Sequence, residues 1–354
     1  MRKIISNYHH RVGSHCGSTL MSNILNCYGY NYNEDICFGL GAGLGFLYRK
    51  SWNPPLYMVL GRGHDIEDKV SQHLGFFAST NITLDNETAW NDVKEEIDRN
   101  HPVLVDVDAS VLTYIKSKFN LFDYVRYGGH RVCVVGYDDE KHTVLLSDYA
   151  WSEIQEISLC EFIEARSSEI GEFPSKNLNF RFYFPEKLVP LEEAIIKGIG
   201  SNVHTMMYPT TRQTGLMGME KFTRQVTYWT IENTEQHVMK NAYITYMMLE
   251  KVGTGGGNFR RIYSRFMNEA GKRLKDEWFF GMAERYWELA EMWSQISKLL
   301  FQSSKDIHVG IFSKENDAAQ QLLNEVYERE ADCIYELKNR IENNYSNARY
   351  EFLR

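Results

Sequence analysis

Three residues that lie far apart in the sequence, a cysteine, a histidine and an aspartate, have types that could cooperate in nucleophilic chemistry. The cysteine is Cys16 in "SHCGSTLMSNILNCYG" (residues 14–29), where it stands in the first turn of a predicted helix. Unpaired N–H groups there favour a thiolate and could hold the oxyanion of a tetrahedral intermediate, and Gly17 leaves room for a substrate. The alternative is a buried, inert thiol, which is the usual role of a lone cysteine.

A nucleophilic cysteine needs a base, and the base needs a group that orients it. His130 follows two glycines and opens the strand-like run "HRVCVVGY", which a polar turn joins to "TVLLSD". With a turn of three or five residues, Tyr137 lies opposite Thr143, so that His130 and Asp148 share one face of the hairpin. A turn of even length would put them on opposite faces. The alternative is a turn histidine and an aspartate that caps a strand end, and the hairpin pattern alone favours neither.

The helix that would carry Cys16 follows from the spacing of apolar residues. Leu20, Ile24 and Tyr28 recur every four residues, and Gly29 is placed as a C-terminal cap. Cys16 is therefore predicted at the N-terminal end of a helix with one apolar face.

The pattern of the chain changes near residue 190. Before it, short strand-like runs alternate with turns, and "FPEKLVPLEEA" then marks a junction. After it, apolar residues recur at helical spacing. We therefore predict an α+β domain over residues 1–188, with a helix packed on an antiparallel sheet, and an all-helical domain over 189–354. The helical stretches are 219–251, 258–272, 276–303 and 316–346.

The composition excludes several classes of protein. The chain has 354 residues, a net charge of −8 and no block rich in Lys or Arg, which argues against binding to nucleic acid or to an anionic membrane. It has no apolar run of about 18 residues, and no secretory signal is expected at its N-terminus. Its six cysteines show no paired spacing, which suits a reducing cytoplasm.

Four separated segments resemble one family. The segments "HCGSTLMSNILNCYGYNYNEDICFGLGAGLGFLY", "HPVLVDVDASVLTY" and "GGHRVCVVGYDDE…VLLSDYA" resemble the N-terminal domain of the butirosin-biosynthesis protein H family. The segment "GTGGGNFRRIYSRFMNEA" resembles the helical domain often fused behind it. The resemblance implies a papain-like cysteine-enzyme fold and a role in secondary metabolism of the antibiotic-biosynthesis type.

The resemblance also implies an acyltransferase reaction. An aminoacyl group passes from the thioester of an acyl carrier protein to the enzyme cysteine and then to an amine of an aminoglycoside-like acceptor, forming an amide. On the matching positions, Cys16 would be the nucleophile, His130 the base and Asp148 the orienting acid. The phosphopantetheine arm of the carrier brings the acyl group, so no cofactor or metal bound by the enzyme is expected. A homodimer is left open.

The residues around the triad depart from the related pattern at one point. The papain-like peptidases closest in pattern place a glutamine six residues before the cysteine as an oxyanion donor, whereas this chain has His10 there. A histidine ring nitrogen can donate a hydrogen bond, so the role could be kept, and His9 and His15 are competitors for it.

An acceptor with several ammonium groups would need carboxylates in its pocket. Asp106, Asp108 and Tyr114 follow a predicted strand near the site and are candidates, although capping of the strand end is equally compatible with each position. Arg62 and His64 could contribute to a basic patch for an acidic carrier protein.

Two glycine-rich stretches have alternative interpretations. Residues 37–48, "CFGLGAGLGFLY", predict either a tight loop over the active-site helix or a backbone wall beside the substrate channel. Residues 253–261, "GTGGGNFRR", predict a helix–helix connection in which Asn258 caps the next helix. The alternative is a site for the phosphate of the carrier's arm at the helix start, with Arg260 and Arg261.

Other functions compete with acyl transfer. A peptidase or amidase of the same fold would use the same three residues, with water in place of the amine. A non-catalytic binding module would not need the three together. An enzyme of another class centred on the helical domain has no supporting residue cluster in 190–354.

Overall fold

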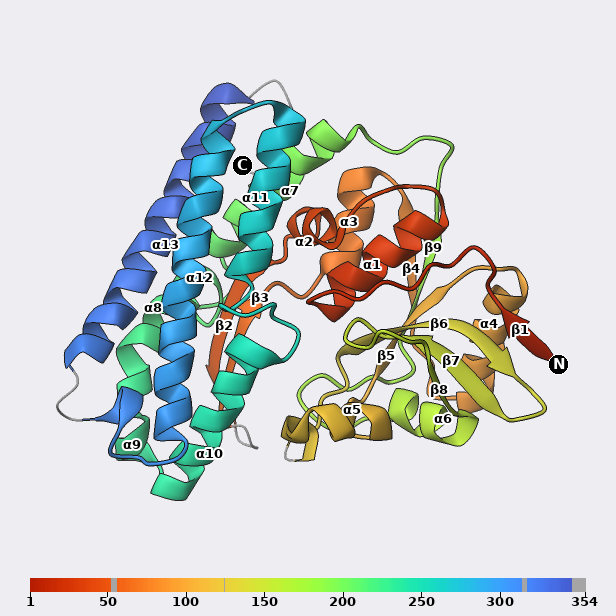
Figure 1. Cartoon of the computed structure of the whole chain (residues 1–354), viewed down its shortest axis with the longest axis horizontal. Helices are drawn as coiled ribbons and strands as arrows, with labels where there is room; N and C mark the ends of the chain where they lie inside the picture. Colours follow the sequence, from red (N-terminus) through yellow and green to blue (C-terminus); the bar gives the residue numbers. More distant parts are fainter. Residues whose placement is uncertain (52–55, 124, 314–316, 346–354) are drawn as a thin grey trace. The chain divides into compact units, whose positions relative to one another are not determined.

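The computed structural model describes residues 1–51, 56–123, 125–313 and 317–345, and the chain folds as two units (Figure 1). The first unit comprises Met1–Cys37 and Gly75–Leu188, and the second comprises Phe38–Leu74 and Val189–Arg354. The predicted domains, 1–188 and 189–354, place residues 38–74 in the first domain, whereas the structure groups them with the second. The reason is a β-hairpin in this segment that packs against helices α7 and α8 of the second unit.

The first unit is built on a seven-stranded sheet in the order β4-β9-β5-β6-β7-β8, with β1 also pairing with β6. All its pairings are antiparallel, and helices α1, α4 and α6 pack against its strands, so the predicted α+β class is confirmed. The strands are β1 (Arg2–Ile4), β4 (Phe77–Asn81), β5 (Val103–Val107), β6 (His130–Asp138), β7 (Thr143–Ser147), β8 (Gln155–Ser158) and β9 (Asn179–Tyr183). The helices are α1 (Cys16–Cys27), α4 (Asn86–Asp98), α5 (Thr113–Lys118), η1 (Asn120–Asp123) and α6 (Leu159–Ser167), with α2 (Glu34–Leu40) at the boundary.

Helix α1 forms as its sequence predicts. It begins at Cys16, and Leu20 and Ile24 are fully buried. Gly29 follows the helix with a φ of 88°, a left-handed conformation that glycine adopts without a steric penalty. The apolar face of α1 packs against β6, so the helix that begins at Cys16 and the strand that begins at His130 are in direct contact.

The β6–β7 hairpin reaches the predicted pairing by a different route. Its turn is the even-length segment 139–142, which sets Tyr137 opposite Val144, so the predicted partner, Thr143, is wrong. A β-bulge at Val135 then shifts the register by one residue and places Cys133 opposite Ser147. Because the bulge compensates for the turn, the strand ends regain the register in which His130 and Asp148 share a face.

The second unit combines a two-stranded hairpin with a set of helices, in which α12 packs against both α11 and α13 (Figure 1). The hairpin strands are β2 (Leu44–Lys50) and β3 (Tyr57–Arg62). The helices are α3 (Ile66–Leu74), α7 (Leu191–Met207), α8 (Gly215–Gln225), η2 (Val226–Tyr228), α9 (Trp229–Glu232), α10 (Glu235–Tyr246), the π-helical η3 (Met247–Lys251), α11 (Arg260–Leu274), α12 (Trp278–Ser303), η4 (Gly310–Phe312) and α13 (Asp317–Asn344).

Three of the four predicted helical stretches match one helix each, and apolar residues that recur at helical spacing along α12, such as Met282, Tyr286 and Leu289, are buried. The stretch 219–251 is instead broken into several short helices, because Asn233 and Thr234 end α9 and cap α10 in extended backbone. Residues 37–48 are not a loop over α1: they form the end of α2, a turn and most of β2. No helix among residues 1–51, 56–123, 125–313 and 317–345 is long and apolar enough to cross a membrane.

The stretch 253–261 leads into a buried ion pair at the start of α11. Arg260 is fully buried; its Nε donates to Glu330 at 3.0 Å and its Nη1 donates to the carbonyl of Gly61 at 2.7 Å. Arg260 therefore has no surface for the phosphate of a ligand. The cap position belongs to Phe259, with a φ of 68°, and not to Asn258 as predicted.

We expect Glu330→Gln to lower the free energy of unfolding by about 3–5 kcal/mol, because it leaves the Arg260 guanidinium buried without a counter-charge. The matched control is Glu336→Gln, which removes an ion pair to Arg285 whose side chains are about one-third to one-half exposed. The Glu336→Gln change is expected to lower the free energy of unfolding by about 0–1 kcal/mol. Urea unfolding of both variants measures the difference, and equal midpoints would contradict a stabilising role for the buried pair.

Candidate active site

Cys16 is the first residue of α1 and is 6% exposed. Its N–H and that of Gly17 have no acceptor within the helix, because they precede the first helical hydrogen bonds. The next two N–H groups are satisfied by His15, whose Nδ1 accepts from Ser18 N at 3.2 Å and whose carbonyl accepts from Thr19 N at 3.0 Å. The first turn therefore presents two N–H groups beside the sulfur.

His130 and Asp148 meet at the ends of β6 and β7. His130 Nε2 donates to Asp148 Oδ2 at 2.8 Å, and both side chains are buried. Since Nε2 is bound to the carboxylate, Nδ1 is the ring nitrogen left for Cys16, which raises the pKa of His130. The predicted trio therefore comes together, and a buried carboxylate orients the imidazole toward the thiol.

The charges of the site are strongly coupled. Burial raises the pKa of the Cys16 thiol, but His15 and His130 outweigh it and hold that pKa well below its ordinary value. Burial lowers the pKa of His130, but Asp148 and Cys16 outweigh it and raise that pKa to about 10. A thiolate beside an imidazolium is therefore the stable state of the pair near neutral pH, which is the form of an activated nucleophile.

We expect alkylation of Cys16 by iodoacetamide to change little between pH 7 and pH 9, because the thiolate already predominates there. The alkylation rate of a free reference thiol such as N-acetylcysteine should instead rise about tenfold for each pH unit, up to a pH of about 8.5. Peptide mass spectrometry after timed alkylation separates Cys16 from the exposed Cys160. A Cys16 rate that followed the reference thiol would contradict the ion pair.

Glu34 supports this site from α2 and escapes prediction from the sequence. Its carboxylate accepts hydrogen bonds from Ser14 N at 2.9 Å, His15 N at 2.7 Å and Thr19 Oγ1 at 2.9 Å. These bonds fix the backbone that leads into Cys16. No local spacing announces the contact, since Glu34 lies on the next helix and resembles an ordinary first-turn acid.

His10 is engaged in contacts of its own. Its Nδ1 lies 2.7 Å from Ser147 Oγ, and its Nε2 lies 2.8 Å from the carbonyl oxygen of Trp151. The neutral ring that satisfies both contacts accepts at Nδ1 and donates at Nε2, so it keeps no N–H for an oxyanion. His10 thus holds the segment before α1 against the end of β7 and the loop that follows it, and the oxyanion role stays a prediction that this geometry does not favour.

Two of the three predicted acceptor-binding residues, Tyr114 and Asp108, have different surroundings. The Tyr114 hydroxyl donates to Asp148 Oδ2 at 2.9 Å, so Tyr114 does belong to the site, but as a partner of the orienting carboxylate. Asp108 is fully buried and is occupied by several donors, among them Ser168 Oγ at 2.8 Å and Arg126 Nε at 3.1 Å. Its carboxylate holds the loops after β5 and α6 together and offers no surface to a cationic acceptor.

The remaining predicted site residues and thiols are placed as follows. Arg62 and His64 belong to the second unit, at and after the end of β3, and their role in a basic patch stays a prediction. All six cysteines are free. Burial, followed by the charges of Glu34 and Asp35, raises the pKa of Cys37 far above its ordinary value, so Cys37 is a poor rival to Cys16 as a nucleophile.

Two family models match the chain. The model of butirosin biosynthesis protein H, N-terminal, matches residues 15–149, which include Cys16, His130 and Asp148. A domain of unknown function (DUF4872) matches residues 161–337. No curated protein matches the chain.

Proposed function

Because the chain belongs to the family of butirosin biosynthesis protein H, we propose that it is a cysteine-dependent acyltransferase of secondary metabolism in the cytoplasm. It would move an aminoacyl or other acyl group from a carrier-protein thioester to an amine, through an acyl-Cys16 intermediate. The observation that carries this proposal is the arrangement of His130 between Cys16 and Asp148, with the 2.8 Å bond to Asp148 Oδ2.

The first half-reaction forms the acyl-enzyme. The Cys16 thiolate attacks the thioester carbonyl, and the oxyanion faces the unpaired N–H groups of Cys16 and Gly17. The C–S bond to the pantetheine arm then breaks, and the leaving thiolate takes the proton held by the His130 imidazolium. One thioester is exchanged for another, so this step needs little driving force beyond positioning.

The second half-reaction makes the amide. The amine of the acceptor attacks acyl-Cys16, His130 accepts a proton from the nitrogen, and the thiolate leaves as the C–N bond forms. Asp148 stabilises the imidazolium in each half-reaction in which it is present, since the carboxylate stays bound to Nε2. The original thiolate–imidazolium pair is thereby restored.

His15 is proposed as an additional donor at the sulfur. Ser18 N–H donates to Nδ1, so the neutral ring carries its proton on Nε2. His15 also lowers the pKa of Cys16, by electrostatic attraction and by a hydrogen bond, against the opposing effect of burial. These contacts favour His15 over His10 as the histidine that donates a hydrogen bond at the reacting centre.

The proposed fold of the first unit is papain-like. Its support is the helix that begins with the nucleophile and packs against an antiparallel strand that begins with the base. The phosphopantetheine arm belongs to the carrier as acyl donor, and the proposed partners are an acyl carrier protein and a small-molecule amine.

The experiment that tests the function is intact-protein mass spectrometry after incubation with acyl-pantetheine thioesters, followed by amines. An acyl adduct that added amines clear faster than water supports the transferase. Clearance by water alone would overturn it in favour of a hydrolase of the same fold. The absence of an adduct with every thioester, together with slow alkylation of Cys16, would favour a non-catalytic binding module.

A further inference from the structure

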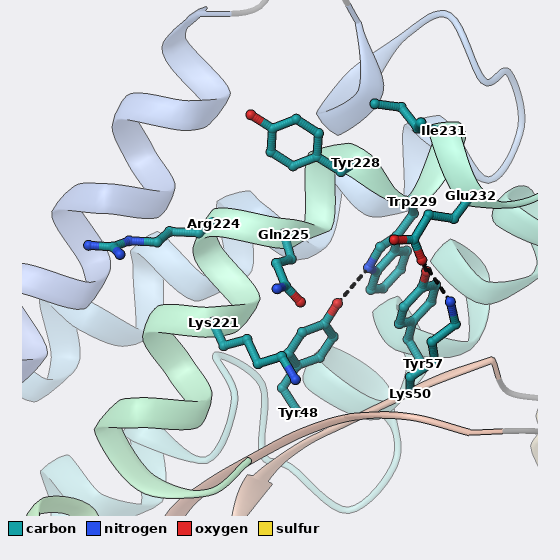
Figure 2. Close-up of a pocket in the computed structure, with 10 residues that line it drawn as sticks. All are labelled: Tyr48, Lys50, Tyr57, Lys221, Arg224, Gln225, Tyr228, Trp229, Ile231 and Glu232. Atoms are coloured by element: carbon teal, nitrogen blue, oxygen red, sulfur yellow. Dashed lines mark hydrogen bonds and ion pairs between the residues drawn. The ribbon is translucent and has the colours of Figure 1, made fainter. Parts of the chain in front are cut away.

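The second unit contains a pocket of about 530 Å³ that no part of the proposed acyl transfer uses (Figure 2). All of its lining residues belong to that unit: the β2–β3 hairpin and Trp229 of α9 supply its floor, and α8, η2 and the rest of α9 supply its walls. The pocket is thus complete within one folded unit, and its volume suits a small organic molecule.

The floor of the pocket is a rigid set of aromatic rings. Tyr57 and Trp229 stack with centroids 4.4 Å apart and planes 2° apart, and Tyr48 lies nearly parallel to both. Trp229 Nε1 donates to the Tyr48 hydroxyl at 2.9 Å, and Asn233 Nδ2 donates to the Tyr57 hydroxyl at 3.1 Å. The ring polar groups are therefore satisfied, and the floor is preorganised.

One wall carries a cation that has not been neutralised. Lys221 is half-buried, its ammonium lies 5.8 Å from the centroid of the Tyr48 ring, and within the described part of the chain it has no carboxylate partner. The other two basic lining residues are paired: Lys50 with Glu232 at 2.7 Å, and Arg224 with a carboxylate of its own helix at 2.7 Å.

The residues around Lys221 add a polar group beside its ammonium and apolar groups at the rim of the pocket. Figure 2 shows Lys221 and Gln225 directed toward Tyr48, whereas Arg224 is directed away from it. At the rim, the ring of Tyr228 is 58% exposed and the side chain of Ile231 is 76% exposed. Exposed apolar groups of this size beside a pocket mark a surface that a bound group can cover.

We propose that this pocket binds a small organic anion that combines a flat ring with one carboxylate or phosphate. Of the three basic lining residues, Lys50 and Arg224 are paired with carboxylates, so the positive charge left for a ligand is that of Lys221, in a chain whose net charge is −8. The anion would pair with Lys221 and accept from the Gln225 amide. The ring would cover Tyr228 and the mouth above Trp229, where aromatic and apolar contact adds to the ion pair.

Binding of matched probes to the full-length protein tests the proposal. The probes are 4-hydroxybenzoate and phenyl phosphate, with 4-hydroxybenzamide lacking the charge and inorganic phosphate lacking the ring. Calorimetry and ligand-observed NMR should detect both ring-bearing anions, and the two incomplete probes should bind at least about tenfold more weakly because each lacks one of the two contacts. The tighter of the two anions identifies the preferred charged group.

Two variants assign the binding to this pocket. Lys221→Gln is expected to weaken the ring-bearing anions about tenfold without changing the melting temperature, because one charge-assisted hydrogen bond is lost. Lys298→Gln, which changes an exposed lysine on α12 outside the pocket, should leave the affinity unchanged. Equal affinities in Lys221→Gln and the wild type, or no binding of either anion at millimolar concentration, would overturn the proposal. So would concentration-dependent self-association that Ile231→Ser abolishes, since the rim would then be covered by a second copy.

Discussion

Cys16→Ala is expected to eliminate the acyl adduct and to reduce acyl transfer by about 10⁵-fold or more, the scale of nucleophile removal in other enzymes with a catalytic triad. The physical reason is that Cys16 carries the thiolate and is placed by α1 beside His130. The measurement is intact mass and single-turnover rate with the best thioester from the panel. Because the side chain is nearly buried and small, the variant should fold with an unchanged circular dichroism spectrum.

The matched control is Cys37→Ala, which removes another buried thiol from the segment that follows α1. Burial and two neighbouring carboxylates keep Cys37 protonated, so its loss should preserve adduct formation within a few-fold. An adduct of undiminished yield on Cys16→Ala would move the nucleophile elsewhere and refute the proposed mechanism.

Asp148→Asn is expected to slow acylation by about 10²–10⁴-fold, the range for loss of a group that orients a catalytic histidine. Burial lowers the pKa of His130, and the Asp148 charge is the largest influence that opposes it. Without that charge, the pKa of His130 falls from about 10, the imidazolium is lost near neutral pH, and the thiolate of Cys16 loses a stabilising partner. The low-pH limb of Cys16 alkylation should therefore move to higher pH.

Asp108→Asn provides the control, because Asp108 is as buried as Asp148 but contacts serines, backbone and Arg126 in place of a histidine. It is expected to lower stability and to leave the alkylation profile of Cys16 in place. The pH profile thus separates the two aspartates even if both variants melt earlier. An unchanged profile in Asp148→Asn would remove Asp148 from the proposed mechanism.

Local patterns were sufficient to predict much of the site. The four-residue spacing of Leu20 and Ile24 predicts the helix that presents Cys16, and the alternation around His130 predicts the hairpin. Glu34 escapes such reasoning, because its hydrogen bonds to Ser14 and His15 depend on how two successive helices pack. The same holds for Tyr114, whose residue type permits many roles until its hydroxyl is placed on Asp148.

Long-range packing also decides the features that the sequence pattern missed. Residues 38–74 precede every strand of the first unit except β1, yet their hairpin packs with helices that follow residue 190. Arg260 is fully buried in the structure. In the sequence it is one of two adjacent arginines after a run of glycines, and this context also fits an anion-binding site. Only the partner Glu330, on the last helix, distinguishes the two.

The bulge at Val135 couples the length of a surface turn to the chemistry at the other end of the hairpin. The four-residue turn 139–142 shifts the pairing register of β6 and β7 by one residue, and the bulge shifts it back. Loss or gain of a single residue in the turn would leave one offset uncorrected and rotate Asp148 to the opposite face. We therefore expect insertions and deletions at this turn to act as mutations of the proposed active site, although loops usually tolerate them. Homologues that keep the triad can vary the turn by one residue only together with a compensating change in β6, and a shortened hairpin in an engineered variant must lose Val135 as well.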